Sequence, residues 1–507
     1  MSDVTSTDGA WDRRRWLILG VICLAQLMVV LDITIVNIAL PSAQKALGFS
    51  TVDRQWVVTA YALAFGSLLL FGGRLADLIG SKVTFLTGLI GFAAVSAIGG
   101  ASTSFAMLVT ARACQGAFGA LLAPAALSLL TTTFSEPKDR GRAFGIFGSI
   151  AASAAAVGLV LGGLLTEYLS WRWCLYVNLF FAGFAAVGGA LLLKRQPPRE
   201  QPKLDVLGVV LAGSSMFCLV YGFSNAASHS WHMPSTYGFL AAGVLLLAVF
   251  AWWQTRAASP LLPPRIVLDR NRGGSYLAIL IQGAGIFSIF LFLTYYMQQT
   301  LGFSPVVTGV ASLPMVAMIA LTANLATIVL LPRVGPKPLV TLGMLLAAGG
   351  MVWLTRIGVH STYAAAVLGP LLVTGAGFGF TIATAINTGT FGVAPRDAGV
   401  ASATVNTGQQ IGGSIGTSLL NTIFASAVAS YIASHMTPGA LVHGRPGPQL
   451  IGLALVHGYT TAFWWSAAIF ASGAVICGTL LRRGPLTQAA VPQGAAAAAP
   501  SAHATAE

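Results

Sequence analysis

Charged side chains are scarce in this chain of 507 residues, where Asp, Glu, Lys and Arg together make up 8%. A soluble protein carries about 25% charged residues, so a chain of this length with so few charges cannot cover a water-facing surface. Hydrophobic residues make up 56%, and no polar stretch is long enough to build a separate soluble domain. The composition therefore predicts one polytopic membrane body and excludes a string of soluble domains.

Cysteine is also rare, with five in the chain. All five stand in or beside apolar runs, without a CxxC pair or a nearby histidine cluster, so we expect packing thiols and neither a disulfide framework nor a metal site. The sequence has no HExxH motif and no phosphate-binding P-loop. We therefore expect no enzyme activity and no cofactor, and any transport must be driven by a gradient.

The net charge of +13 is concentrated in short segments between the apolar runs. We number the loops by their order between successive apolar runs. Of the 27 Lys and Arg residues, 21 lie in the N-terminal stretch, the even-numbered loops and the C-terminal end, and five lie in the odd-numbered loops. Cytoplasmic loops of membrane proteins are enriched in Lys and Arg, so this bias predicts that both termini are cytoplasmic. It also explains the basic charge without nucleic acid, which we do not expect as a partner.

Long apolar runs recur along the chain, and we count fourteen between residues 16 and 481. About 20 apolar residues suffice for a helix to cross the bilayer. Helices are favoured because lipid offers the backbone no other partner, and the alternation typical of a membrane barrel does not occur. The first run contains Asp32 and is long, so it is expected to be a retained helix and not a cleaved signal peptide.

The two ends of the chain contain matching segments. The matches are LGFS at 47–50 with 301–304, Gly80, Lys82 and Gly88 with Gly335, Lys337 and Gly343, and PKDRGRA at 137–143 with PRDAGVA at 395–401. The offsets of 254, 255 and 258 are nearly equal, so predicted helices 1–6 correspond to helices 9–14, with helices 7 and 8 inserted. Parallel repeats of this kind place a substrate site at the midplane between two bundles.

The predicted organisation follows from these repeats. It consists of a cytoplasmic tail (1–15), an N-terminal six-helix bundle (16–195), inserted helices 7 and 8 (204–256), a C-terminal six-helix bundle (272–482) and a disordered cytoplasmic tail (484–507).

Two charged residues, Asp32 and Arg112, lie deep inside apolar runs. A charge at the bilayer centre costs roughly 2.5–3.5 kcal/mol on insertion scales and by default marks an ion or proton path. Burial favours the neutral form of a carboxylate and a nearby cation favours the ionised form, and this competition is what a proton switch requires. A permanent salt bridge is the alternative for Asp32, and hydrogen bonding to backbone carbonyls is the alternative for Arg112.

The segment GRLADLIGSKV (73–83) connects the second and third apolar runs. Gly73 allows close helix approach and Gly80 a tight turn. Arg74, Asp77 and Lys82 place charges at the cytoplasmic rim, where a charge network can latch two helices in one state of a transporter. Ordinary enrichment of positive charge in a cytoplasmic loop is the alternative.

Taken together, the motifs resemble those of the major facilitator superfamily. GRLADLIGSKV is similar to its motif A, Leu108–Gly116 to its motif B, and GLVLGG (158–163) to its helix-5 antiporter motif. LDITIVNIALP (31–41), WRWCLYVN (171–178) and LDVLG (204–208) resemble motifs of the 14-helix drug:proton antiporters.

The resemblance implies an all-α membrane fold of 14 transmembrane helices, arranged as two six-helix bundles plus two inserted helices. It implies that Asp32 and Arg112 couple protons to transport. It also implies close packing by Gly158, Gly162 and Gly163.

Four positions depart from the family pattern. Leu78 and Ser81 replace basic residues of motif A, which weakens the expected latch. Leu159 and Phe180 replace prolines. Without a proline at Leu159, the kink expected in the fifth helix is lost.

The predicted function is proton-coupled export of small hydrophobic drugs or antibiotics across the inner (cytoplasmic) membrane, by a monomer that alternates access. No carboxylate stands centrally in predicted helices 8–14, so neutral or singly charged substrates are favoured. Candidate cavity residues are Asn37, Tyr295, Asn387 and Gln410. A dedicated metabolite exporter or an uncoupled facilitator on the same fold stays open, whereas a membrane-embedded enzyme or sensor lacks any visible catalytic or sensory module.

Overall fold

The computed structural model describes residues 4–50, 53–134, 136–193, 205–228, 231, 233–393, 398–436, 441–442 and 445–485. Of the tail expected at 484–507, only Gly484 and Pro485 fall within these ranges.

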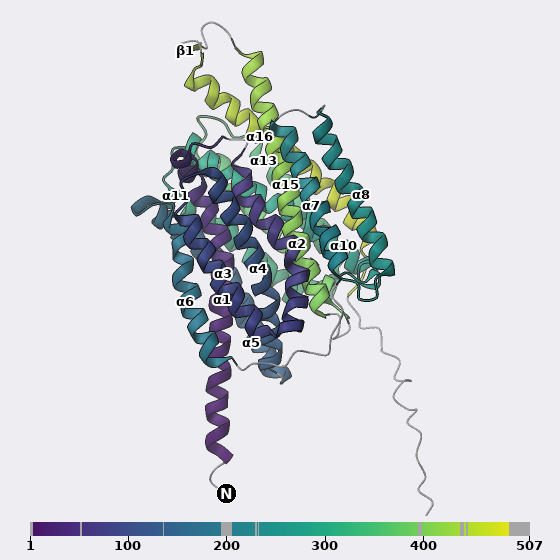
Figure 1. Ribbon diagram of the computed structural model, residues 1–507. Helices are drawn as coiled ribbons and strands as arrows, with labels where there is room; N and C mark the ends of the chain where they lie inside the picture. The colour runs from purple at the N-terminus through teal and green to yellow at the C-terminus, as the bar shows by residue number, and fades with distance from the viewer. Residues whose placement is uncertain are drawn as a thin grey trace, which may run out of the picture.

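Long helices dominate the described chain (Figure 1). The N-terminal half forms α1 (Val4–Leu47), α2 (Gln55–Ile79), α3 (Ser81–Gly100), α4 (Phe105–Thr133), α5 (Pro137–Tyr168) and α6 (Trp173–Leu192). The inserted region forms α7 (Val206–Ser228), α8 (Pro234–Arg256) and the short α9 (Pro264–Val267).

The C-terminal half has the same kind of helices, interrupted by short π-helical segments. Its elements are α10 (Arg270–Tyr295), η1 (Tyr296–Thr300), α11 (Pro305–Leu325), η2 (Ala326–Leu330), α12 (Leu331–Val334), α13 (Pro336–Leu354), η3 (Ala364–Leu368), α14 (Gly369–Thr390), α15 (Ala398–Ser434) and α16 (Pro448–Leu480). A two-stranded hairpin, β1 (Leu441–Val442) and β2 (Arg445–Pro446), joins the last two helices.

Among the described residues, twelve helices are long and apolar enough to cross a membrane. Two further apolar stretches, Gln55–Leu69 in α2 and Ala156–Tyr168 in α5, are shorter within the described part. A helix satisfies its own backbone hydrogen bonds, which lipid cannot do. The multi-pass, all-α architecture predicted from the sequence is therefore confirmed.

We call the side where α1 begins the near side and the opposite side the far side. Figure 1 shows the near side at the bottom, with the chain's N-terminus, and the β1–β2 hairpin at the top. The helix α1 begins at Val4, within the segment 1–15 expected to be a tail. A helix can continue beyond the apolar layer because its hydrogen bonds are internal.

The internal repeat is visible in the backbone as well as in the sequence. Gly48 and Gly302, one in each LGFS segment, have φ angles of 69° and 70°. Gly80 and Gly335, which separate consecutive helices on the near side, have φ angles of 92° and 78°. L-residues rarely adopt positive φ, so the two halves use glycine for the same turns at matching positions.

The two halves meet where α2 packs against α15 and where α5 packs against α11. The inserted helix α7 packs against both α2 and α15. Thr422 of α15 donates a hydrogen bond to the Phe223 carbonyl of α7 at 2.7 Å, and the rings of Trp56 and Tyr221 lie 6.3 Å apart. The inserted pair therefore lies beside the α2–α15 contact (Figure 1).

Buried apolar residues form two clusters that differ in depth. The larger cluster unites the C-terminal half with the far-side part of the N-terminal half, including Val36 and Val57. The second cluster contains only N-terminal-half residues in its core, such as Ile18, Phe85 and Leu129, and lies toward the near side. The shared core shows that the described conformation has its two halves packed together on the far side.

Candidate functional site

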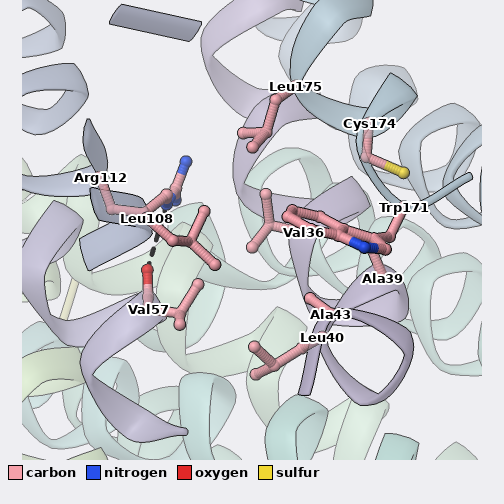
Figure 2. Close-up of a pocket in the computed structure, with 10 residues that line it drawn as sticks. All are labelled: Val36, Ala39, Leu40, Ala43, Val57, Leu108, Arg112, Trp171, Cys174 and Leu175. Atoms are coloured by element: carbon pink, nitrogen blue, oxygen red, sulfur yellow. Dashed lines mark hydrogen bonds between the residues drawn. The ribbon is translucent and has the colours of Figure 1, made fainter. Parts of the chain in front are cut away.

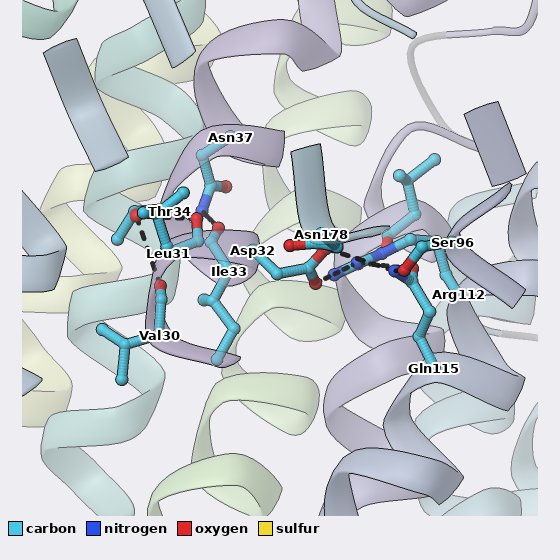
Figure 3. A network of polar contacts seen from close by, with 11 residues as sticks. Val30, Leu31, Asp32, Ile33, Thr34, Asn37, Ser96, Arg112, Gln115 and Asn178 are labelled. Carbon is cyan, nitrogen blue, oxygen red and sulfur yellow. Dashed lines mark hydrogen bonds and ion pairs between the residues drawn. The ribbon is translucent and has the colours of Figure 1, made fainter. Parts of the chain in front are cut away.

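The two intramembrane charges of the sequence form a buried pair. Asp32 on α1 is 0% exposed and Arg112 on α4 is 2% exposed. Arg112 Nη1 lies 2.5 Å from Asp32 Oδ2 (Figure 3). The structure thus joins residues that are 80 positions apart, as the proposal of a shared role requires.

Amide side chains complete the surroundings of the Asp32 carboxylate. Asn178 on α6 donates to Asp32 Oδ1 at 2.7 Å, and Gln115 on α4 donates to the same oxygen at 3.2 Å. Gln115 also donates to Ser96 on α3 at 2.7 Å. We call Asp32, Ser96, Arg112, Gln115 and Asn178 the buried polar network (Figure 3).

The Arg112 guanidinium has partners beyond the carboxylate. Its Nε donates to the Val57 carbonyl of α2 at 3.1 Å, and Nη1 donates to Gln115 Oε1 at 2.9 Å. The guanidinium carbon lies 4.5 Å from the centre of the Tyr61 ring. Arg112 therefore contacts Asp32, and it also makes the backbone-carbonyl hydrogen bond that was raised as its alternative role.

This geometry defines what the network can do chemically. A buried pair is tolerated when hydrogen bonds satisfy both charges, and removing one partner leaves a buried charge that costs about 3–5 kcal/mol. Every hydrogen-bond partner printed for the Asp32 carboxylate is a donor. Separation of Arg112 from the carboxylate would therefore leave two buried charges without their counter-charge.

Glycine residues allow α5 to approach α1 and α11 closely. A Cβ atom at Gly158 would collide with the Thr34 hydroxyl of α1, and one at Gly162 would lie 3.0 Å from the Ile35 Cα. At Gly163 it would lie 2.7 Å from the Val306 Cα of α11. The glycine face expected from GLVLGG thus packs against α1 in its own half and against α11 in the other half.

The departure at Leu159 has a visible counterpart. The helix α5 runs from Pro137 to Tyr168 without a break, as expected for a chain that lacks the family's proline. The Leu159 carbonyl lies against Gly309 of α11, where a Cβ atom would collide with it. A second glycine, which we did not single out from the sequence, therefore closes the same interface from the opposite half.

The motif-A residues are divided between turn, packing and capping. Gly80 has φ 92° between α2 and α3. Lys82 donates to the Ala190 carbonyl at 2.9 Å and to the Leu193 carbonyl at 2.5 Å, at the C-terminal end of α6. A cation at that end is favourable because the helix dipole is negative there. Lys82 therefore ties α3 to α6 within one half.

The remaining motif-A positions are less informative. A Cβ atom at Gly73 would make only ordinary contact with Pro124 at 3.6 Å, whereas one at the neighbouring Gly72 would collide with the Ala120 carbonyl. The close approach of α2 to α4 therefore falls at Gly72. The side chains of Arg74 and Asp77 lie outside the described residues.

The candidate cavity residues occupy four different environments. Asn37 donates to the Ile33 carbonyl of its own helix at 2.9 Å. Tyr295 is fully buried at the far-side contact of the halves. Asn387 is exposed on α14 and donates to the Ala383 carbonyl at 2.8 Å, and Gln410 packs against Gly66 at the α2–α15 contact. The described structure does not bring these four residues together.

The far side is closed by polar contacts between the halves. Glu167 Oε2 of α5 accepts from the Val306 N–H at the start of α11 at 3.0 Å. Gln298 of η1 donates to the Ile38 carbonyl of α1 at 3.1 Å. Arg54 at the start of α2 lies against the Tyr295 ring of α10. These contacts, together with the shared apolar core, hold the far side shut.

A small apolar cavity adjoins the network on its far-side flank (Figure 2). Its volume is about 10 Å³, the room of about one water molecule. The lining residues other than Arg112 are apolar, among them Val36, Leu108 and Trp171. A drug-sized site needs roughly 300–1,000 Å³, so this cavity gives Arg112 free space but does not hold a substrate.

One serine pattern is excluded as a catalytic site by its surroundings. Residues 412–416 have the spacing GxSxG, which in hydrolases forms a sharp strand-to-helix turn. Here the segment lies inside α15, and the Ser414 hydroxyl donates to the Gln410 carbonyl at 3.0 Å. Within the described residues, no three His, Cys, Asp or Glu side chains gather as a metal site would require.

The fold and the motif residues define a two-bundle membrane transporter, and sequence comparison agrees. Residues 22–417 match the Major Facilitator Superfamily, and the chain belongs to this family. The family membership confirms the resemblance noted in the sequence, and it makes the protein a transporter and not an enzyme.

Relatives of this chain include antibiotic resistance and export proteins. The chain is 45% identical to the puromycin resistance protein pur8 of Streptomyces alboniger over 97% of this chain and 95% of that one. It is 39% identical to the cephamycin export protein CmcT of Amycolatopsis lactamdurans, over 82% and 86%. A solved auto-inhibited POT family peptide transporter shares the fold, with TM-score 0.66 and 15% identity over 95% and 99%.

Proposed function

We propose that this protein is a proton-coupled antiporter that exports hydrophobic antibiotics or drugs from the cell by alternating access. The observation that carries the proposal is the fully buried Asp32–Arg112 pair inside the N-terminal half. A carboxylate at this depth is costly, and a transporter that must respond to protons gives it a use.

In the proposed cycle, the described conformation is the one that has just released its proton. The far side is closed and Asp32 is paired with Arg112. When the far side opens, the substrate leaves and a proton from outside neutralises Asp32. Arg112 then keeps its Val57 and Gln115 acceptors without the carboxylate, and the two halves rock back. Proton release toward the near side restores the pair.

The driving force is adequate for export. One charge moving through 100 mV supplies about 2.3 kcal/mol. Because each 1.4 kcal/mol corresponds to a factor of ten, one proton supports roughly 40-fold accumulation from the voltage alone, and a pH gradient adds to it.

The proposed topology has fourteen spans and cytoplasmic termini. In addition to the twelve apolar spans, we count α2 (Gln55–Ile79) and α5 (Pro137–Tyr168) as the remaining two spans. An even number of spans places the beginning of α1 and the end of α16 on one side. The positive-inside rule identifies that near side as the cytoplasm. We propose a monomer, because one chain contains both halves and the buried polar network.

The proposed substrates follow from the relatives and from the site chemistry. Proteins 45% and 39% identical to this chain are named for puromycin resistance and cephamycin export. Asn387 and Gln410 are candidates for substrate contact. We therefore expect export of several antibiotics rather than of one metabolite, with puromycin the first compound to test.

The test uses inside-out membrane vesicles with an acidic lumen. Adding puromycin should release protons from the lumen and concentrate the drug inside. Asp32→Asn should abolish both signals while the protein stays monodisperse. The control Glu136→Gln removes an exposed near-side carboxyl and should transport normally.

Other results would contradict the proposal. Full gradient-driven uptake by Asp32→Asn would remove Asp32 from the coupling mechanism. Unchanged uptake after the gradient is collapsed would identify an uncoupled facilitator. Transport of a single compound from a broad panel would identify a dedicated exporter.

A further inference from the structure

A second buried arginine lies at the far-side contact of the two halves. Arg54 precedes the first residue of α2 and is 0% exposed. Within the described residues no hydrogen bond of standard geometry reaches its Nε, Nη1 or Nη2 atoms, although the hydroxyls of Tyr295 and Tyr459 lie close enough to interact with the guanidinium. Arg112, at similar burial, has a carboxylate, an amide and a carbonyl. The two guanidinium groups are therefore stabilised in different ways.

Aromatic rings of the C-terminal half surround the Arg54 charge. The guanidinium carbon lies 4.1 Å from the ring centre of Tyr295, 4.7 Å from that of Phe424 and 5.8 Å from that of Phe292. A fourth ring, Tyr459, lies 4.9 Å from Phe424. We call Arg54 and the rings of Phe292, Tyr295 and Phe424 the aromatic clamp. Every ring in it belongs to the half that Arg54 does not.

The clamp is one helical turn from the buried polar network. Val57 donates its N–H to the Arg54 carbonyl at 3.3 Å, and its own carbonyl accepts from Arg112 Nε at 3.1 Å. The beginning of α2 therefore touches the charge pair of one half and the aromatic rings of the other. A displacement of α2 that follows the release of Arg112 would change the distances between the Arg54 guanidinium and the aromatic rings of the clamp.

Two opposing effects act on Arg54 when the far side closes. Removing a guanidinium from water without a counter-charge is costly. Cation–π contacts offset part of this cost, by about 0.5–2 kcal/mol or more when desolvated. Opening the far side would separate α2 from α10 and α15 and return the charge to water.

From this arrangement we infer that Arg54 is a positioning residue of the transport cycle. Its buried charge lowers the stability of the far-side closed state, and the aromatic clamp limits this loss so that the closed state still forms. This inference rests on the alternating access of the proposed function. It assigns to Arg54 no contact with proton or substrate.

The inference predicts opposite effects for the two partners of the clamp. Arg54→Met keeps an unbranched but shorter side chain and removes the charge, so the closed state should gain stability and the open fraction should fall about tenfold. Tyr295→Leu removes a ring and leaves the charge, so the open fraction should rise about twofold to thirtyfold. In the double variant, the Tyr295→Leu effect should disappear.

Two control variants test whether the effect comes from the Tyr295 hydroxyl or from the loss of any far-side positive charge. Tyr295→Phe keeps the ring and removes the hydroxyl, and it should behave as the parent protein. Arg356→Gln removes an exposed far-side arginine and should leave the open fraction unchanged.

The measurement is the distance between spin labels on Ala46 and Thr362, which are exposed on the far side of the N- and C-terminal halves. The full chain, with its five native cysteines replaced, is studied in lipid nanodiscs without substrate. Opposite shifts for Arg54→Met and Tyr295→Leu, with silent controls, support the inference. Shifts of the same sign, no shift, or a Tyr295→Phe effect equal to that of Tyr295→Leu overturn it.

The distance measurement and the transport assay fail independently. Loss of puromycin-driven proton release in the parent protein would contradict the proposed function, whereas the label distances need neither substrate nor gradient. An intact transport assay with unaltered label distances in the clamp variants would contradict only the role given to Arg54.

Discussion

Two buried arginines, Arg112 and Arg54, illustrate at the scale of single residues how a membrane protein accommodates charge. Arg112 is neutralised by Asp32 and held by further acceptors. Arg54 is surrounded by aromatic rings. A carboxylate can be neutralised by a proton and an aromatic ring cannot. The first arrangement is therefore suited to sensing protons, and the second responds only to separation of the rings.

The Asp32–Arg112 pair should behave as one unit in a thermal unfolding experiment. Asp32→Asn or Arg112→Gln alone leaves an unpaired buried charge or an incomplete donor set, with an expected cost of about 3–5 kcal/mol. The double variant Asp32→Asn/Arg112→Gln should lose less than the sum of the single losses. Scanning fluorimetry of Tm in detergent measures this, and strictly additive losses would show that the two side chains are independent.

Asn178 should contribute through its single bond to the Asp32 carboxylate. A hydrogen bond to a charged group contributes about 1.5–3 kcal/mol, so Asn178→Ala should lower Tm and weaken proton-coupled uptake. The matched control is Asn324→Ala, because Asn324 is exposed on α11 and bonds to its own helix. Equal effects of the two substitutions would argue against a role for the Asn178 amide.

The sequence identified the charges of this site but not their amide partners. Asp32 and Arg112 stand out because charge inside an apolar run is rare. Both amide residues occur within motifs quoted from the sequence. Gln115 lies near the end of the motif-B segment, and Asn178 is the last residue of WRWCLYVN. A neutral amide in a helix is common as a bond between helices, so only the folded structure distinguishes these two from the others.

At the scale of elements, α5 contacts both halves through glycine residues. Its Gly158 and Gly162 face α1, while Gly163 faces α11. Glycine repeats predict close helix packing, but a repeat cannot say which neighbour each glycine meets. That assignment depends on the rotation of α5 within the bundle, which many distant contacts determine together.

Gly163→Ala should interfere specifically with closure of the far side. The added Cβ would lie 2.7 Å from the Val306 Cα in the other half, and backbone cannot yield easily. We expect a longer Ala46–Thr362 distance and reduced export. Gly183→Ala on α6 is the control, because nothing lies within 4 Å of its Cβ position, and alanine is the better helix former.

One outcome would contradict the prediction for Gly163→Ala. If the label distance and the export rate both match those of Gly183→Ala, then the α5–α11 contact is not needed for closure. The reciprocal substitution Gly309→Ala, which would meet the Leu159 carbonyl, should reproduce the Gly163→Ala effect.

At the scale of the whole molecule, the two halves are related in sequence but differ in chemistry. Matching turns at Gly48 and Gly302 follow the repeat, whereas the positions that correspond to Asp32 and Arg112, about Ile286 and Val367, are apolar. Proton coupling is therefore proposed for one half, and the other half supplies the aromatic rings of the clamp. The two functions meet where the beginning of α2 touches both halves.

The proposed topology is testable by labelling single cysteines from either side of the membrane. In a background without the native cysteines, Ala46→Cys should react with an impermeant maleimide from outside the cell. Arg483→Cys should react only in inside-out vesicles, because the end of α16 lies on the near side with the beginning of α1 (Figure 1). Labelling of both positions from the same side would contradict an even number of spans.

The amino-acid sequence alone predicts a membrane environment, a helical structure, an internal repeat and the two residues that carry charge into the membrane. These are consequences of composition and local spacing, since a bilayer accepts only apolar helices of sufficient length. The folded structure was needed to show that the far side is closed, that amides from α4 and α6 contact Asp32, and that Arg54 lies among rings from the other half. Such contacts join residues far apart in the chain, and they exist only once the two halves have packed together.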